Sequence, residues 1–445
     1  MPRRAGEHRA MRWSACAILS AWLVVIGCDE ASPREGDAGR DAAQGSVDAA
    51  RPGDDASAVI DAASDAPPSG VSGRVTYDRR PFARTGLGAA IASSAPGVIV
   101  VLLDGEREVA RTTTDEDGAY AFDAQGDGVR VLASSGDPES AVTDFDGATY
   151  AFRGPAGDLH VGETDFAGAL AIAHTMREGL EYARVAFERD EPFPPLETHW
   201  ERGRTTPGGT SYASGDELWI LGGPDDTDEF DEPVLLHELG HFLQHVIPFS
   251  RIVGGDPHAG ADTDPRLAWN EGWPSFFASA VRGDPFYGDT VGGEISLALD
   301  LGALPRSGDF VANAGAPMSQ PLSEWIIASS LWRLYVASAD VDQQRARSFG
   351  VLTRWLAEGA SDRAADGPEL VDFLDGYLCT HAGADRAVIE SYVVADRSFP
   401  YDLAPPCEKP GRPRAVVMRD PAPVWLPGHR IVDVRGRVLR EIVIR

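Results

Sequence analysis

The sequence predicts an α+β fold, in which a small β-sandwich precedes a larger domain with a helical C-terminal lobe. Residues 71–152 contain short runs of alternating apolar and polar residues, separated by turns rich in Gly, Asp and Ser, as expected for β-strands. Beyond Gly162, apolar residues recur every three or four positions, which is the spacing of amphipathic helices. With 445 residues, the chain has room for two domains and accessory segments.

These changes in pattern predict five segments. They are a signal peptide at 1–27, a disordered tether at 28–70, a β-sandwich at 71–155, a second domain at 160–400 and a β-rich tail at 401–445. The tether consists mostly of Asp, Ala, Gly, Ser and Pro without an aromatic residue, so it cannot bury enough apolar surface to fold. The net charge of −29 argues against nucleic acid as a partner, because binding phosphates requires a basic surface.

The N-terminus has the features of an export signal. Four arginines precede the apolar run SACAILSAWLVVIG, which is too short for a stable membrane span but suits a secretory signal. The run ends in Val25-Ile26-Gly27-Cys28, which resembles a bacterial lipobox. This resemblance implies a lipid on Cys28 and a protein anchored outside the cytoplasm, at the outer membrane or cell surface. A plain signal peptide with an incidental cysteine is the alternative.

Two cysteines remain in the folded part once Cys16 and Cys28 are assigned to the N-terminal segment. In an oxidising compartment Cys379 and Cys407 are expected to form one disulfide, and two unpaired buried thiols are the alternative.

In the predicted β-sandwich, the segment Thr112–Phe122 (TTTDEDGAYAF) resembles a hairpin of carboxypeptidase regulatory-like domains. That hairpin is a strand, a turn and a second strand with an aromatic pair. The resemblance covers about 80 residues and implies a spacer or binding module rather than a catalytic domain.

The stretch DEPVLLHELGHFLQHVIP, residues 231–248, predicts a helix that could bind a metal. Asp231 is expected to cap it, Pro233 suits its first turn and Pro248 ends it. His237 and His241, four residues apart, project from one face, with Glu238 beside them. Two imidazoles and a carboxylate suit zinc with a position left for water, although histidines at this spacing also occur on solvated helix faces.

The third ligand has to come from another part of the chain. A metzincin pattern would require Gly at 244 and His at 247, where the sequence has Gln244 and Ile247. His245 lies about 12 Å along the axis from His237, too far to share one ion. The remaining candidate is Glu271, within the apolar stretch LAWNEGWPSFFASA.

The HELGH and NEGW motifs together resemble those of the gluzincins, the thermolysin-like zinc metallopeptidases, over about residues 165–340. The resemblance implies a zincin-type fold for 160–400, His237, His241 and Glu271 as zinc ligands, and Glu238 as the general base. It is nearer to an uncharacterised lipoprotein branch than to thermolysin itself. Ser275 and Phe276 stand where the thermolysin pattern continues toward Ser-Asp, so the aspartate that orients the first histidine is missing.

Other residues are weaker candidates. His258, in the turn-rich segment between the two motifs, is the first choice for an oxyanion donor, followed by Tyr287 and Tyr335; a loop histidine without a role is the alternative. Glu324 resembles an acid that recurs at the start of a helix in the same branch, but helix capping by or beside it is the preferred interpretation.

The loop before the HELGH helix is rich in carboxylates. Such clusters attract hard cations, so Ca²⁺ is a possible second cofactor, although the spacing fits no EF-hand and a solvated acidic loop is the alternative. The residues concerned are Asp225, Asp226, Asp228, Asp231 and Glu232.

These observations predict a zinc-dependent endopeptidase with a peptide or protein substrate. Zinc is expected to activate water, Glu238 to take and return its proton, and the strand around 217–221 to align the substrate by β-addition. Two alternatives remain: a non-catalytic lipoprotein that binds protein or glycan on the same scaffold, and an enzyme that processes cell-wall peptides.

Overall fold

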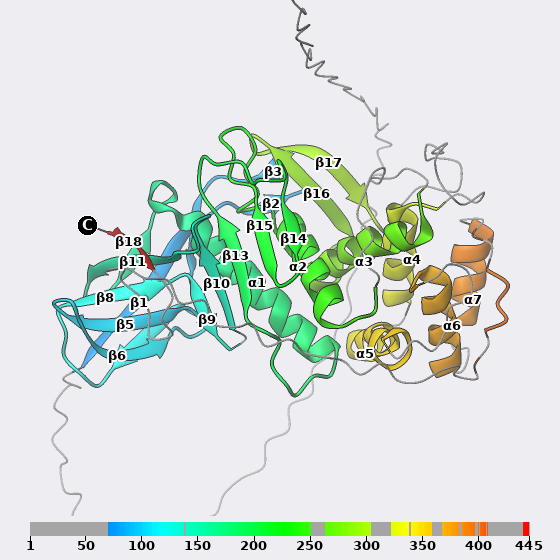
Figure 1. Cartoon of the computed structure of the whole chain (residues 1–445), viewed down its shortest axis with the longest axis horizontal. Coiled ribbons are helices and arrows are strands. Elements are labelled where there is room, and N and C mark those ends of the chain that lie inside the picture. The colour runs from blue at the N-terminus through cyan, green and yellow to red at the C-terminus, as the bar shows by residue number, and fades with distance from the viewer. Residues whose placement is uncertain are drawn as a thin grey trace, which may run out of the picture. The chain divides into compact units, whose positions relative to one another are not determined.

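The computed structural model describes residues 70–137, 139–250, 263–303, 322–337, 340–357, 367–381, 385–396, 399, 401–405, 407 and 439–444. All of them belong to one compact unit, Ala66–Arg445. The predicted signal peptide, Cys28 and the tether up to residue 69 lie outside the described residues, as does His258. The fold is mixed α+β (Figure 1).

Two sheets share a core in the N-terminal part. One contains β1 (Val71–Arg79), β4 (Ile91–Ser94), β7 (Ala119–Phe122) and β12 (Leu159–Val161). The other includes β5 (Ile99–Asp104), β6 (Arg107–Thr113) and β8 (Gly128–Leu132). Alternate residues of the strands point inward, so that Val75 and Tyr77 of the first sheet share a core with Val100 and Leu102 of the second.

The segment Thr112–Phe122 does not form the predicted hairpin. Strand β6 pairs with β5, whereas β7 pairs with β1 in the other sheet. The carboxylate of Asp115 accepts hydrogen bonds from the backbone N–H groups of Asp117 and Ala119, which holds a tight turn between the strands. The chain therefore crosses between the sheets here, and buries Tyr120 and Phe122 in the core.

The larger sheet continues into the region predicted as a second domain. Strand β10 (Glu139–Thr143) pairs in parallel with β13 (Leu196–Trp200), which pairs in parallel with β15 (Glu217–Ile220). The sheet order is β14-β15-β13-β10-β11-β8-β5-β6, with β11 at Thr149–Pro155 and β14 at Tyr212–Ser214. The predicted β-sandwich and the residues after it thus share one sheet (Figure 1).

Two helices pack against the larger sheet. Helix α1 (Ala167–Ala186) contacts β10, and α2 (Glu232–Val246) contacts β14 and β15 (Figure 1). Further along the chain are α3 (Pro265–Arg282), the hairpin of β16 (Phe286–Val291) and β17 (Glu294–Asp300), α4 (Glu324–Tyr335), α5 (Val341–Val351), α6 (Leu370–Thr380) and α7 (Arg386–Val388). Short elements elsewhere are β2 (Phe82–Ala83), β3 (Gly86–Leu87), β9 (Ser134–Gly136) and a 3-10 helix at Glu163–Asp165. Two π-helical turns, Leu352–Leu356 and Ile389–Asp396, follow α5 and α7. Among the described residues, no helix is both long and apolar enough to cross a membrane.

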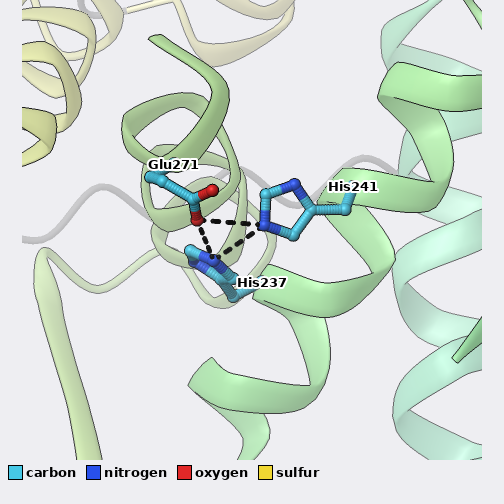
Figure 2. A group of neighbouring side chains, drawn as sticks. All are labelled: His237, His241 and Glu271. Carbon is cyan, nitrogen blue, oxygen red and sulfur yellow. Dashed lines mark hydrogen bonds and ion pairs between the residues drawn. The ribbon is translucent and has the colours of Figure 1, made fainter. Parts of the chain in front are cut away.

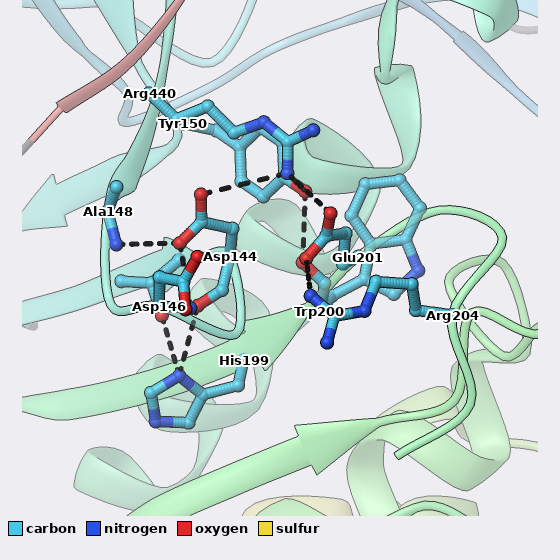
Figure 3. Close-up of polar contacts among 10 residues, drawn as sticks. Asp144, Asp146, Ala148, Tyr150, His199, Trp200, Glu201, Arg204 and Arg440 are labelled. Atoms are coloured by element: carbon cyan, nitrogen blue, oxygen red, sulfur yellow. Dashed lines mark hydrogen bonds and ion pairs between the residues drawn. The ribbon is translucent and has the colours of Figure 1, made fainter.

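The structure pairs Cys379 of α6 with Cys407 in a disulfide. Strand β10 pairs with β11 through a single residue pair. Strand β18 (Leu439–Val443) then runs parallel to β11 and pairs with it over residues 149–153. Arg440 anchors this strand: its Nη1 lies 3.2 Å from the Tyr150 hydroxyl and 3.3 Å from a Glu201 carboxylate oxygen (Figure 3).

Candidate metal centre and active site

Helix α2 carries His237, Glu238 and His241 and begins one residue after Asp231. Asp231 is at the predicted N-cap position, but its side chain makes no capping hydrogen bond to the helix. Its carboxylate accepts hydrogen bonds from the backbone N–H and the hydroxyl of Thr290 instead, at 3.0 and 2.8 Å. Asp231 therefore ties the start of α2 to strand β16.

Helix α3 approaches α2 closely because Gly240 has no side chain. A Cβ atom at Gly240 would lie 2.8 Å from both Cα and Cβ of Pro274, closer than packed carbon atoms allow. Glu271 lies one turn before Pro274 on α3. The central glycine of the HELGH motif thus brings Glu271 beside the two histidines.

Three ligand atoms converge in this space (Figure 2). Nε2 of His237 lies 3.2 Å from Nε2 of His241, and Oε2 of Glu271 lies 3.4 and 3.2 Å from these two atoms. A tetrahedral zinc site with bonds of about 2.05 Å separates its ligand atoms by about 3.3 Å. The donor set and the spacing therefore fit zinc, whereas Ca²⁺ takes mostly oxygen ligands at longer distances.

Each of the three side chains is oriented by a second contact. Nδ1 of His237 lies 3.1 Å from Oγ of Ser275, and Nδ1 of His241 lies 3.0 Å from Oε1 of Gln244. The Asn270 amide donates to Oε1 of Glu271 at 3.0 Å, which leaves Oε2 facing the histidines. The orienting roles of Gln244 and Asn270 were not predicted from the sequence, although Asn270 is the first residue of the NEGW motif.

Charge coupling within the group is strong. Burial lowers the pKa of His241, but the carboxylate of Glu271 outweighs it and raises this pKa to about 9. Burial opposes ionisation of Glu271, yet the histidines hold its pKa well below the usual range. The pocket therefore favours a carboxylate that faces a positive charge.

Glu238 lies beside this group and is 7% exposed. Burial raises its pKa, while His237 and His241 act in the opposite direction. The backbone N–H of Ala213, on strand β14, also acts to lower this pKa. Glu238, the three ligand-type residues and strand β14 line one cavity of about 720 Å³.

The strand that borders this cavity differs from the predicted one. Residues 212–220 form a hairpin, because Gly215 adopts a positive φ of 67° and reverses the chain. Strand β14 is at the edge of the sheet, and β15 lies between β14 and β13. The prediction that residues 217–221 pair with a substrate is therefore wrong, since both sides of β15 are occupied.

Of the weaker candidates, some line the cavity and others do not. Tyr287 lines the cavity, and its ring centroid lies 5.8 Å from that of His237. Tyr335 does not line the cavity; its hydroxyl lies 3.0 Å from that of Tyr182. Glu324 lines the cavity, and the hydroxyl of Ser323 next to it caps α4, as the preferred interpretation of this position expected.

The acidic loop contributes to a second group of carboxylates. Asp226 and Asp228 join Asp289 of β16, with one oxygen of each within 4.8 Å of the others. Asp289 was not among the predicted residues, because it comes from a distant hairpin. Glu232 instead pairs with Arg79 and Arg282, and Asp225 is exposed.

Residues 187–354 match the family model of the Mycolysin C-terminal domain. The match covers less than half of the chain, includes both α2 and α3, and indicates a relationship to mycolysin and thermolysin-like peptidases. It does not reach the N-terminal β-strands before residue 187. No curated protein matches the chain.

Proposed function

We propose that this chain is a zinc-dependent endopeptidase with His237, His241 and Glu271 as metal ligands. The observation that carries this proposal is the spacing of the three ligand atoms, 3.2 to 3.4 Å apart, with a buried glutamate next to them. The similarity to the Mycolysin C-terminal domain over the same residues supports it.

The chain's own groups fit peptide hydrolysis. Zinc, when bound, supplies Lewis-acid chemistry that acidifies water and polarises a carbonyl group. Glu238 takes a proton from the attacking water and passes it to the leaving amine. A raised pKa suits this role, because the carboxyl group has to hold the proton between the two transfers.

Strand β14 aligns the substrate. It lies at the edge of the sheet and borders the cavity, so an extended peptide can add to it through main-chain hydrogen bonds. Burial keeps the pKa of Tyr287 well above its usual value, so its hydroxyl stays protonated and can donate to a developing oxyanion. His258 is a second candidate donor.

Two matched variants test the proposal. Glu238→Gln leaves all three ligands in place, so zinc content should be unchanged while peptide cleavage falls by about 10² to 10⁴-fold. Glu271→Gln should lose zinc and activity together, because a neutral amide is a poor zinc ligand. Metal analysis and an unbiased peptide-cleavage profile on the same preparations provide both measurements.

The outcomes separate the possible functions. If Glu238→Gln cleaves as fast as the unmodified chain, the general-base role fails; if Glu271→Gln still binds one zinc tightly, the third ligand is wrong. Stoichiometric zinc without cleavage of any peptide favours a non-catalytic binding protein on this scaffold. Cleavage confined to peptidoglycan stem peptides favours cell-wall processing.

We also propose that the protein is an extracytoplasmic lipoprotein anchored through Cys28. The support is the sequence Val-Ile-Gly-Cys after an apolar run. Cys28→Ser should release the protein into the soluble fraction, and membrane retention of this variant would contradict the proposal.

A further inference from the structure

One end of the active-site cavity is acidic. Besides the ligand Glu271 and the base Glu238, its lining includes the carboxylates of Asp228, Asp289 and Glu324, and no lysine or arginine among the described residues. Asp228 and Asp289 belong to the group that Asp226 completes. A substrate bound at the metal centre reaches into this cavity. The acidic end should therefore influence which substrate side chains bind there.

Apolar side chains line the same cavity as the metal centre and these carboxylates. Val234 lies three residues before His237 and so on the same face of α2, and Leu297 of β17 lines the cavity as well. Tyr287 is next to His237, and Asp289 follows two residues later on β16, on the same side and about 7 Å along the strand. A cavity lined by these apolar side chains suits a long aliphatic stem with a polar end.

Asp226, Asp228 and Asp289 each have a carboxylate oxygen without a hydrogen-bond partner among the described residues. Asp228 is 4% exposed; the Ser211 hydroxyl donates to its Oδ2, and the described residues provide no hydrogen bond to its Oδ1. Oδ1 of Asp226 and Oδ1 of Asp289 are buried without a hydrogen-bond partner. Burial, with a smaller effect of neighbouring carboxylates, raises the pKa of Asp228 to about 9. A cation placed among these oxygens would offset the free-energy cost of burying their negative charge.

A calcium ion fits the group less well. Ca²⁺ takes about six to eight oxygen ligands, and this group offers one oxygen from each of three side chains. Main-chain carbonyls often complete a calcium shell, but that of Asp228 accepts from the N–H of Asp231, and that of Asp289 accepts from the Ser296 hydroxyl. An ammonium or guanidinium group needs only a few acceptors and arrives on an apolar stem.

We infer that this end of the cavity is a specificity subsite for a lysine or arginine side chain of the substrate. Val234, Leu297 and Tyr287 contact its stem, and Asp228 and Asp289 accept hydrogen bonds from its charged end, with Asp226 behind them. The inference rests on the proposed peptidase function and adds the class of substrate: peptides with a basic residue next to the scissile bond.

Matched peptides test the subsite. Peptides that carry lysine at one position flanking the scissile bond are compared with peptides that carry norleucine, which keeps the stem and lacks the charge. The unmodified chain should prefer lysine by about 10 to 100-fold in kcat/KM at one of these positions. The Glu238→Gln chain should show the same preference in peptide binding, a measurement that does not depend on turnover.

Substitution of the carboxylates should remove this preference. Asp228→Asn and Asp289→Asn each keep the volume and should lower the lysine-to-norleucine ratio of kcat/KM by about tenfold or more. Asp225→Asn is the control, because Asp225 is exposed and does not line the cavity. Thermal unfolding of each variant shows whether it is folded.

The results distinguish this inference from the proposed function. Cleavage without a preference for basic residues overturns the subsite and leaves the peptidase intact. Absence of cleavage contradicts the peptidase, and binding of the lysine and norleucine peptides then decides the subsite separately. Stoichiometric Ca²⁺ that is lost in Asp228→Asn, with unchanged peptide preference, identifies a structural metal site instead and overturns the inference.

Discussion

Oγ of Ser275 lies 3.1 Å from Nδ1 of His237 and donates its own hydrogen to the backbone carbonyl of Glu271, at 3.2 Å. The serine oxygen therefore accepts from the histidine, which directs the unprotonated Nε2 toward the metal position. A neutral hydroxyl thus orients His237 here, where the aspartate expected from the thermolysin-like pattern is missing. Ser275 orients the ligand His237 and is hydrogen-bonded to the backbone of the ligand Glu271.

We expect Ser275→Ala to weaken zinc binding by about 10 to 100-fold, because His237 loses the acceptor that fixes its ring and tautomer. Competition with a chelator of known affinity measures this change. Ser279→Ala is the matched control: Ser279 is equally buried, lies one turn later on α3, and its Oγ has no hydrogen-bond partner. Equal zinc affinity in the two variants would contradict the orienting role.

Gly240→Ala should destabilise the protein and reduce zinc binding together. The new Cβ would lie 2.8 Å from backbone and side-chain atoms of Pro274, so α3 has to move away and carry Glu271 with it. Overpacking of this kind costs about 1 to 3 kcal/mol, more than the helix propensity of about 1 kcal/mol that alanine adds. Urea unfolding and metal analysis provide the two measurements.

Gly350→Ala on α5 is the corresponding control. A Cβ there would have only the end of the Arg354 side chain within 4 Å, so the variant should be as stable as the unmodified chain or slightly more so. A Gly240→Ala protein that matches it in stability and zinc content would show that the close contact of α2 and α3 is not required.

Deprotonation of Asp231 should lower the free energy of unfolding as pH rises. It is fully buried, and burial outweighs the hydrogen bonds from Thr290 to raise its pKa from 3.8 to about 7. The folded state then holds the proton more tightly than the unfolded state. The resulting stabilisation is complete below the ordinary pKa and is lost as pH rises through about 7.

Asp231→Asn removes this titration and keeps an oxygen that can accept from Thr290. The free energy of unfolding of the variant, relative to the unmodified chain, should therefore rise between about pH 4 and about pH 8. Urea unfolding across this range measures the difference. A difference that does not change with pH would show that Asp231 ionises in the folded state as readily as in the unfolded state.

Loss of the disulfide should lower stability. Cys379 and Cys407 are 28 residues apart, and closing a loop of this length is expected to stabilise by about 3 to 4 kcal/mol through the unfolded chain. Cys379→Ser with Cys407→Ser should reduce the free energy of unfolding accordingly. Two free thiols in the purified protein, detected by mass spectrometry, would contradict the pairing.

Helix α2 was predictable because its signals are local: Pro233 in the first turn, Pro248 after the end and histidines at helical spacing. The choice of Glu271 relied on a second motif and on the exclusion of other positions. The structure brings all three side chains together.

Other features depend on contacts that the sequence pattern does not encode. Whether Asp231 caps a helix or binds Thr290 is decided by a strand 59 residues away. Asp289 reaches the acidic group from the same hairpin, so no local pattern links it to Asp226 and Asp228. The break between β14 and β15 does have a local signal, since Ser-Gly-Asp is a common turn sequence.

Strand β18 makes the fold dependent on residues that are synthesised late. Arg440 contacts Tyr150 across 290 positions of sequence, and β11 has no other neighbour along most of the edge that β18 covers. A chain that is cut or stalled before Leu439 would leave this edge open to pairing with other molecules, which is a common route to aggregation. A proteolytic cut just before Leu439 should thus have consequences far from the cut, for the solubility and turnover of the whole protein.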